Sequence, residues 1–253
     1  MPLPDETESD DMKAEIRYLF HSGFTVKTDR HFFIFDYYQD SPAGGGLDKG
    51  VIDPEEIEAL DVVVFVSHSH GDHYNPRIYD WRKKISRIRY VLADGVEVSG
   101  DAAVVTPGQT YDLGDLEVSA LESTDIGLAF LIKADGLCIY HAGDLNDWYW
   151  NGEPDADNLA MTRRYREQID RLKGERIDIA FVPVDPRLEE HALRGLIYFM
   201  ETVGAKLAVP MHFGRDLSIF ETLKTDARTA GWRDKIALFS RRGELIGYPP
   251  DKA

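Results

Sequence analysis

The stretch His68-Ser69-His70-Gly71-Asp72-His73 decides the fold and the chemistry of this 253-residue chain. It directly follows the apolar run Asp61–Val66, which is typical of a strand covered on both faces. Imidazole and carboxylate groups bind zinc and similar divalent ions. Alternate side chains of extended backbone point the same way, so His68 and His70 are predicted to bind one ion. Asp72 and His73, at the turn beyond, are predicted to bind a second ion next to it.

The segments around this loop predict an α/β fold. Strands are predicted over residues 14–20, 24–28, 31–37, 88–92, 116–121, 127–133 and 137–141. Asp53 and Asn75, each followed by proline, are predicted to start short helices. Later, helices over 158–173, 189–203 and 216–230 alternate with strands over 177–182, 207–209 and 236–239. A strand-rich part followed by this alternation predicts a four-layer αββα sandwich, a single domain over residues 13–253.

The amino-acid composition argues against several kinds of binding partner. Forty-five acidic against twenty-nine basic residues give a net charge of -16, which argues against nucleic-acid binding. The longest apolar runs are far too short to span a membrane. Residues 1–12 have no signal-peptide pattern and are predicted to be a disordered acidic tail, so a cytoplasmic location is expected. Cys138 is the only cysteine, which excludes an internal disulfide and a multi-cysteine zinc site.

Two further ligand-type residues follow predicted strands. Asp144 comes after the strand over 137–141 in a Gly-Asp step, which lets the backbone turn and aims the carboxylate out of the strand end. His212 comes after the strand over 207–209. Either residue alone has a plain structural explanation, as a helix cap or a core histidine. Together with the histidine loop, both are predicted to bind metal.

These segments together resemble the metallo-β-lactamase superfamily, whose hallmark is an H-x-H-x-D-H loop after a strand. The resemblance extends along most of the chain, through residues 21–24, 33–36, 140–144 and 209–214. The tripeptide Pro210-Met211-His212 and the loop Asp185-Pro186-Arg187 are most similar to the branch that holds ascorbate-6-phosphate lactonase and uncharacterised bacterial zinc-dependent hydrolases. The resemblance implies that Asp144 bridges two ions and that Asp36 braces the histidine loop through a hydrogen bond.

The remaining histidines are predicted to bind no metal. The family's metal position matches Asp144 rather than His141, so His141 is expected to support the ligands from behind. His21, His31 and His191 are interpreted in the same way. Asp125, Asp185 and Trp148 are additional candidates for contact with metal or substrate, Trp148 because it follows Asp144 closely and could wall a pocket.

The sequence departs from the family pattern at one ligand. The family supplies another histidine about twenty residues before the bridging aspartate, but residues 121–127 contain none. Three arrangements are compatible with this. In the first arrangement, the first ion binds through three protein ligands and water. In the second, Asp125 or Glu122 replaces the histidine and makes the site more favourable for Mn or Fe. In the third, only the second metal position is occupied.

The expected function is that of a metal-dependent hydrolase. One or two ions, zinc by default and Mn or Fe as the alternatives, would generate a metal-bound hydroxide at neutral pH. The substrate is expected to be a small ester, lactone, amide or phosphodiester, with Asp72 as the catalytic residue that moves a proton to the leaving group. The alternative is a non-catalytic metal-binding protein of the same fold, because of the missing histidine. A nuclease is disfavoured by the charge.

Overall fold

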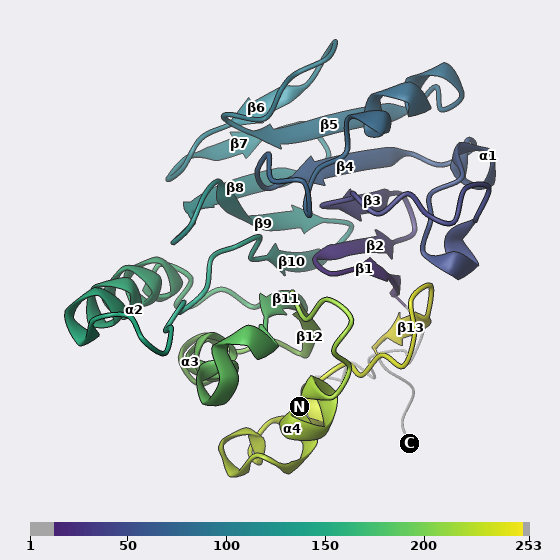
Figure 1. Ribbon diagram of the computed structural model, residues 1–253. Coiled ribbons are helices and arrows are strands. Elements are labelled where there is room, and N and C mark those ends of the chain that lie inside the picture. The colour runs from purple at the N-terminus through teal and green to yellow at the C-terminus, as the bar shows by residue number, and fades with distance from the viewer. Residues whose placement is uncertain (1–12, 250–253) are drawn as a thin grey trace, which may run out of the picture.

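Two β-sheets face each other across a shared apolar core in the computed structural model, which describes residues 13–249. The predicted tail over residues 1–12 lies outside the described residues. The first sheet has the order β13 (Leu245–Tyr248), β1 (Ala14–Phe20), β2 (Gly23–Lys27), β3 (Phe32–Phe35), β4 (Val62–Val66), β5 (Ile88–Ala93) and β6 (Ala103–Val105). The second has the order β12 (Leu207–Met211), β11 (Ile179–Pro183), β10 (Leu137–His141), β9 (Leu128–Ala134), β8 (Glu117–Glu122) and β7 (Thr110–Asp112) (Figure 1).

The core lies between the sheets and consists largely of aromatic rings. Phe24 and Phe35 of the first sheet contact Phe181 of the second, with ring centroids 4.8 and 5.7 Å apart. Phe65 in β4 meets Phe130 in β9 edge to face at 5.3 Å. All five residues of β4 are buried, and β4 pairs in parallel with β3 and β5. Its continuous apolar sequence is therefore explained by cover on both faces.

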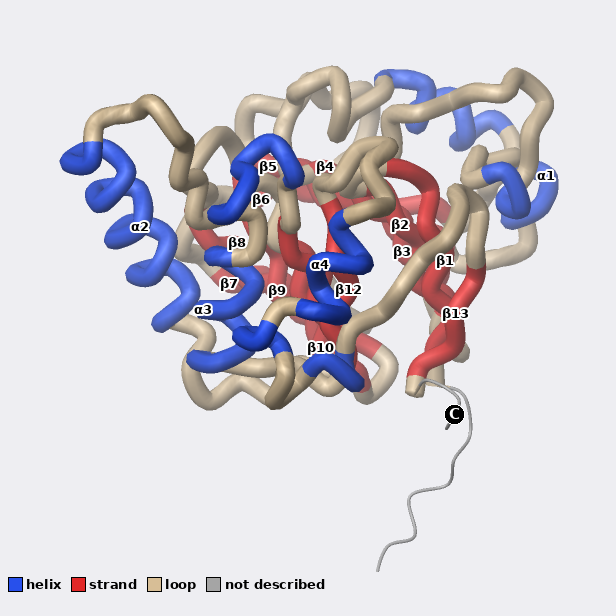
Figure 2. The backbone as a smooth tube through the Cα atoms, turned by 60° about the horizontal axis from the view of Figure 1, so that its bottom comes forward, coloured by secondary structure: helices blue, strands red, loops and turns tan. Residues whose placement is uncertain are grey.

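Helices form the two outer layers, as Figures 1 and 2 show. The short α1 (Pro54–Ile57) and the 3-10 helix Pro76–Lys83 lie beside the first sheet, each capped as predicted by the side chain of Asp53 or Asn75. On the second sheet lie α2 (Asp155–Asp170) and α3 (Arg194–Thr202), and α4 (Ile219–Thr225) follows β12. Within the described part of the chain, none of the helices has the length and apolarity to cross a membrane. The predicted α/β class and layered arrangement are confirmed.

Several local predictions differ from the structure. The helix predicted over 189–203 is divided: a 3-10 helix, Pro186–His191, is interrupted by Glu189 at φ 54°, and α3 begins only at Arg194. The helix predicted over 216–230 is broken by the extended backbone of Asp226. The strand predicted over 236–239 is wrong, since Ile236 makes only one isolated bridge, to Ala208. The strands β6, β7 and β13 were not predicted because they are short and have no clear alternation.

Candidate metal centre

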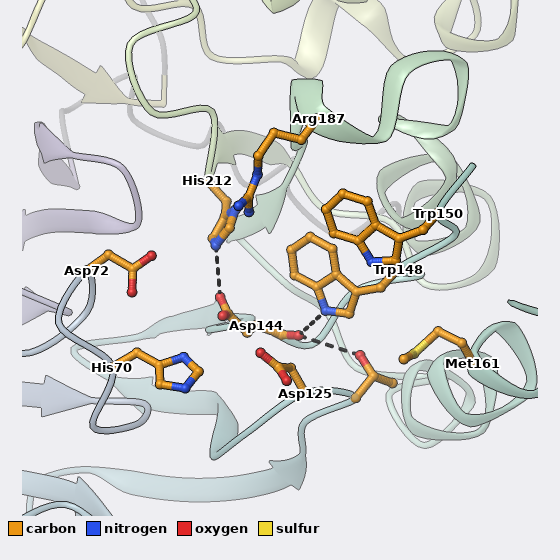
Figure 3. A pocket seen from close by; sticks show the side chains of 10 residues that line it. His70, Asp72, Asp125, Asp144, Trp148, Trp150, Met161, Arg187 and His212 are labelled. Atoms are coloured by element: carbon orange, nitrogen blue, oxygen red, sulfur yellow. Dashed lines mark hydrogen bonds and ion pairs between the residues drawn. The ribbon is translucent and has the colours of Figure 1, made fainter. Parts of the chain in front are cut away.

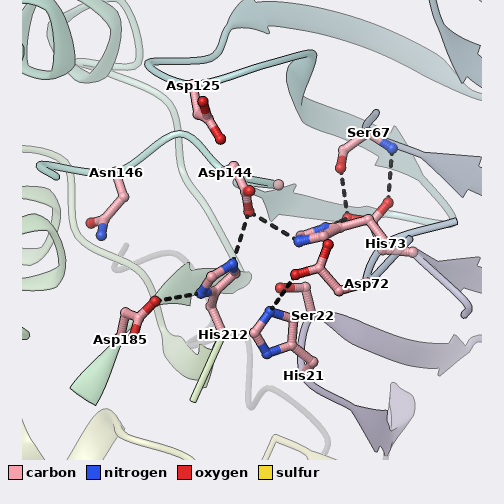
Figure 4. A network of polar contacts seen from close by, with 12 residues as sticks. His21, Ser22, Ser67, Asp72, His73, Asp125, Asp144, Asn146, Asp185 and His212 are labelled. Atoms are coloured by element: carbon pink, nitrogen blue, oxygen red, sulfur yellow. Dashed lines mark hydrogen bonds and ion pairs between the residues drawn. The ribbon is translucent and has the colours of Figure 1, made fainter. Parts of the chain in front are cut away.

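The predicted ligands come together at one edge of the sandwich, and both sheets contribute to them. The histidine loop leaves β4 of the first sheet and closes in a tight turn, in which the backbone N–H of His73 donates to the carbonyl of His70 at 3.0 Å. Asp144 follows β10, and His212 follows β12, both in the second sheet. Figure 4 shows Asp72, His73, Asp144 and His212 pointing toward one another.

Asp144 is the point on which the histidines converge. Nε2 of His73 and Nε2 of His212 lie 3.2 and 3.3 Å from its Oδ1, and Nε2 of His68 lies 3.5 Å from its Oδ2. Burial alone would raise the pKa of the Asp144 carboxyl, but the adjacent His73 and His212 hold it well below its usual range. Asp144 is therefore a carboxylate, and histidines face both of its oxygens.

Buried carboxylates accept hydrogen bonds from the Nδ1 atoms of His73 and His212, on the side of each ring that faces away from Asp144. Asp36 accepts hydrogen bonds from the backbone N–H of Ser67 at 2.8 Å, from the Ser67 hydroxyl at 2.7 Å and from Nδ1 of His73 at 2.8 Å. Asp185 accepts from Nδ1 of His212 at 3.0 Å. A bond at Nδ1 fixes the ring and leaves Nε2 free to bind a metal. The structure thus places Asp36 as a brace, and Asp185, a candidate for metal or substrate contact, as a second brace.

The inner atoms of the cluster test whether a metal fits. Nε2 of His21, His68 and His73 and Oδ1 of Asp144 are buried and lie 3.2 to 3.6 Å from an oxygen or nitrogen of a neighbouring cluster member, but they make no well-formed hydrogen bond within the described residues. A buried polar atom without a partner costs stability, so such atoms are expected to be satisfied by something else. Imidazole nitrogen and carboxylate oxygen are the donors that zinc and related ions take. The residues therefore fit one or two divalent ions.

His21 joins this cluster, although its place in the sequence predicted only a structural role. Its Nε2 lies 3.6 Å from Oδ2 of Asp72, and it forms a group of potential ligands with Asp72, His73 and His212. It stands in the turn between β1 and β2 at φ 55°, and its carbonyl accepts from the backbone N–H of His212. Burial and the neighbouring His212 and His73 lower the pKa of His21 to about 3, so its ring is neutral. The sequence signals for His21 were its position directly after a strand and its place in the segment over residues 21–24 that resembles the superfamily.

Asp125 stands where the family's histidine is missing. Its carboxylate forms a group of potential ligands with His70 and Asp144, and it lines the same cavity as they do. Glu122, the other replacement considered, lies in a separate small pocket with Arg164 and Glu167. Of the two carboxylates, the geometry therefore favours Asp125 as the ligand that completes the first position.

Replacing Asp125 with alanine is expected to remove one metal ion per chain and leave the other. The first position would keep only His68, His70 and Asp144, whereas the second keeps its full set of imidazoles. Elemental analysis of zinc-reconstituted protein measures this directly. Glu122→Ala is the matched control and is expected to retain the wild-type metal content. Loss of metal in Glu122→Ala but not in Asp125→Ala would contradict the assignment.

Two glycines that contact Ser67, the residue before the histidine loop, explain how the sheets approach each other here. Gly127, at φ 78°, lies so close to Ser67 that a Cβ atom would collide with the Ser67 carbonyl. Gly143, at φ 51°, would collide with the Ser67 side chain. The approach lets the backbone N–H of Leu128 donate to that carbonyl at 3.0 Å. A hydrogen bond thus joins the two sheets directly beneath the metal centre.

His141 and Trp148 support the site without joining the ligand cluster. His141 is fully buried, its Nε2 bonds to the carbonyl of Ser22 at 3.0 Å, and its Nδ1 accepts from the backbone N–H of Gly143 at 3.2 Å. It therefore holds the turn that carries Asp144. Trp148 donates from Nε1 to the carbonyl of Asp144 at 2.9 Å and meets the ring of His212 edge-on.

A cavity of about 380 Å³ opens above the cluster (Figure 3). Its polar floor consists of His70, Asp72, Asp125, Asp144 and His212, and its wall of Trp148, Trp150 and Met161. The side chain of Asp72 is 52% exposed, so it can contact a bound molecule as well as an ion. The volume suits a small molecule.

The αββα fold, with a histidine and aspartate cluster at its strand ends, defines the metallo-β-lactamase-like class. A family model, the beta-lactamase superfamily domain, matches residues 15–148, just over half of the chain, and this chain belongs to that superfamily. A UPF0173 metal-dependent hydrolase from Thermococcus kodakarensis is 27% identical over 246 residues, covering 92% of this chain and 99% of the relative. These findings agree with the predicted family.

Two solved structures show the same fold at low sequence identity. Igni18, a metallo hydrolase from the archaeon Ignicoccus hospitalis, aligns with a TM-score of 0.64 at 16% identity, covering 93% of this chain and 98% of its own. YhfI from Bacillus subtilis, a metallo-beta-lactamase fold protein, aligns with a TM-score of 0.57 at 10% identity, covering 94% and 100%. The fold is therefore shared along nearly the whole length of all three chains.

Proposed function

We propose that this chain is a metal-dependent hydrolase of a small ester, lactone, amide or phosphodiester. The observation that carries the proposal is the set of buried ligand atoms on His21, His68, His73 and Asp144, which converge at 3.2 to 3.6 Å without forming a well-formed hydrogen bond within the described residues and lie below an open cavity. Zinc suits the imidazoles, and the carboxylate of Asp125 at the first position makes Mn or Fe more favourable than the usual histidine would. The hydrolase names of the relatives support this class.

The chain's own residues supply binding, orientation and proton transfer. A divalent ion held by these residues would lower the pKa of a bound water and polarise the substrate oxygen. Asp72, which lines the cavity and has a half-exposed side chain, would take a proton from the attacking water and pass it to the leaving group. Asp36 and Asp185 hold His73 and His212 in the orientation that the ligands need. The indoles of Trp148 and Trp150 exclude water from one side of the cavity.

A small-molecule substrate is favoured over nucleic acid. The cavity holds about 380 Å³, which is the size of a small ligand site. The net charge of -16 opposes the approach of a polyanionic chain.

Chelation is expected to abolish hydrolysis reversibly. Protein treated with a chelator and then dialysed would lose turnover of 4-nitrophenyl ester, lactone and phosphodiester probes. Activity would return on addition of Zn²⁺, Mn²⁺ or Fe²⁺, and the ion that restores most identifies the preferred metal. The measurement pairs probe turnover with metal content from elemental analysis.

Two results would contradict this proposal. Metal-free protein that remains fully active would exclude metal-dependent chemistry. Protein that carries two ions per chain and hydrolyses none of a broad panel of probes would favour the non-catalytic metal-binding alternative.

A further inference from the structure

Arg187 is the only arginine or lysine among the described residues that line the cavity above the metal centre. It also lines a second cavity, of about 610 Å³, on the other side of His212, together with Tyr38 and Phe213. Its side chain is 65% exposed. Arg215 also lines the second cavity, but among the described residues Arg187 is the only basic side chain that lines both. A molecule bound in either cavity can therefore contact Arg187.

The position of the Arg187 guanidinium is fixed by its neighbours. Its Nε donates to both oxygens of Asp185, at 3.0 and 2.9 Å, and its backbone N–H donates to the same carboxylate at 2.9 Å. Asp185 in turn holds Nδ1 of His212 at 3.0 Å. The Nη1 group of Arg187 has no hydrogen-bond partner in the described part of the chain. Two N–H donors on a pre-positioned guanidinium are thus available beside a metal ligand.

A rigid aromatic wall stands next to these donors. The guanidinium carbon of Arg187 lies 5.7 Å from the centroid of the Trp150 ring. The indoles of Trp148 and Trp150 are parallel to within 10°, with centroids 6.3 Å apart. The backbone of Trp150 is clamped by Asn158, which bonds to both its N–H and its carbonyl at 2.9 Å. A flat apolar group can therefore pack against a surface that is already ordered.

We propose that the substrate carries a negative charge on or directly beside its scissile bond, bound by Nη1 of Arg187, and a planar apolar group that packs on Trp148 and Trp150. This inference rests on the proposed hydrolase function. Two divalent ions and Arg187 would carry five positive charges, which balance the five carboxylates of the centre, Asp36, Asp72, Asp125, Asp144 and Asp185. The centre would thus be close to neutral although the whole protein is acidic, and Nη1 of Arg187 can bind an anion there. Hydrolysis forms a bond from the water oxygen to phosphorus or carbonyl carbon, breaks the bond to the leaving oxygen and transfers a water proton to that oxygen.

Arg187→Gln tests the charge, and the chain offers a matched control. Arg228 makes the same set of bonds to Asp226 that Arg187 makes to Asp185, with Nε at 3.0 and 3.1 Å from the two carboxylate oxygens, but it lines neither cavity. Arg228→Gln therefore removes an equivalent ion pair away from the site. Arg187→Lys keeps the charge and loses the planar guanidinium.

Three probes with the same leaving group separate the effects. They are bis(4-nitrophenyl) phosphate, a 4-nitrophenyl ester with a free carboxylate, and neutral 4-nitrophenyl acetate. Arg187→Gln is expected to lower kcat/KM for an anionic probe by about 10- to 100-fold, the usual effect of losing a hydrogen bond to a charged group. The acetate is expected to change less than about twofold, and Arg187→Lys to restore part of the loss. If only the phosphodiester loses kcat/KM, the charge that Arg187 binds lies on the scissile group of the substrate. If only the carboxylate ester does, that charge lies beside the scissile group.

A binding measurement keeps this inference separate from the hydrolase proposal. In zinc-loaded protein, quenching of tryptophan fluorescence by 4-nitrobenzylphosphonate reports binding without turnover, and 4-nitrobenzyl alcohol is the neutral comparison. Arg187→Gln is expected to weaken phosphonate binding about tenfold and leave the alcohol unchanged. If the wild type hydrolyses no probe, the hydrolase proposal fails while this titration still decides the role of Arg187. Equal losses for charged and neutral molecules, with reduced zinc content, would overturn the inference and leave Arg187 as a support for His212.

Discussion

Replacing Asp144 with asparagine is expected to remove bound metal and lower hydrolysis by about 1,000-fold or more. Three imidazole nitrogens face this one carboxylate at 3.2 to 3.5 Å, so both predicted metal positions depend on it. An amide has nearly the same shape but lacks the charge that balances the ions. A metal ion supplies several kcal/mol of transition-state stabilisation, and each 1.36 kcal/mol is a factor of ten in rate.

The experiment compares metal content by elemental analysis, turnover of a 4-nitrophenyl probe, and thermal unfolding of the chelated proteins. Asp94→Asn is the control, because Asp94 is exposed at the end of β5 and thus also follows a strand, but in the first sheet and away from the cavity. Asp144→Asn protein that keeps two ions and wild-type turnover would disprove the bridging role. A variant that loses metal yet folds with the circular dichroism spectrum of the wild type supports it.

Asp36→Ala is expected to lower the free energy of unfolding by about 3–5 kcal/mol and to weaken metal binding by about 10- to 100-fold. Asp36 is fully buried and accepts three hydrogen bonds, so its loss leaves the N–H of Ser67, its hydroxyl and Nδ1 of His73 without a partner. Burial would raise the pKa of Asp36, but the hydrogen bond from His73 lowers it, so the group is ionised at neutral pH.

Urea unfolding of the chelated protein and zinc titration separate the two effects. Asp178→Ala is the matched control, since Asp178 is also buried and accepts from the backbone N–H of Cys138 and the hydroxyl of Tyr248, away from the metal centre. This variant should lose stability while its ordered fraction binds zinc normally. Asp36→Asn keeps the shape and is expected to lose less stability than Asp36→Ala. Unfolding and zinc affinity of Asp36→Ala equal to the wild type would refute its role as a brace.

Much of the metal centre can be predicted from the sequence, because most of its ligands lie next to a recognisable strand in the sequence. The histidine loop presents its ligands within a few residues of one buried strand, and Asp144 and His212 each follow an apolar strand that is easy to recognise. The layered fold follows for the same reason, since the central strands are continuous apolar runs. The edge strands β6, β7 and β13 escape prediction because three or four residues are too few to reveal alternation.

The remaining residues of the site depend on tertiary approach. His21 becomes a potential ligand only because the turn between β1 and β2 lies against His212, with ring centroids 3.9 Å apart. From the sequence, Asp125 and Glu122 are equally good candidates to replace the missing histidine. Only the conformation of the turn after β8 directs Asp125 into the cavity. The importance of Arg187 depends on the 3-10 helix Pro186–His191, where the sequence pattern placed a loop leading into one long helix.

Because the ligands come from both sheets, a bound ion is also a cross-link that closes the open edge of the sandwich. An ion that binds only the folded chain adds about 2.7 kcal/mol of stability when its free concentration is 100 times the dissociation constant. The supply of metal in a cell would then determine how much of the chain survives proteolysis, as well as how much of it is active. A shortage of metal would therefore lower the amount of the protein in the cell.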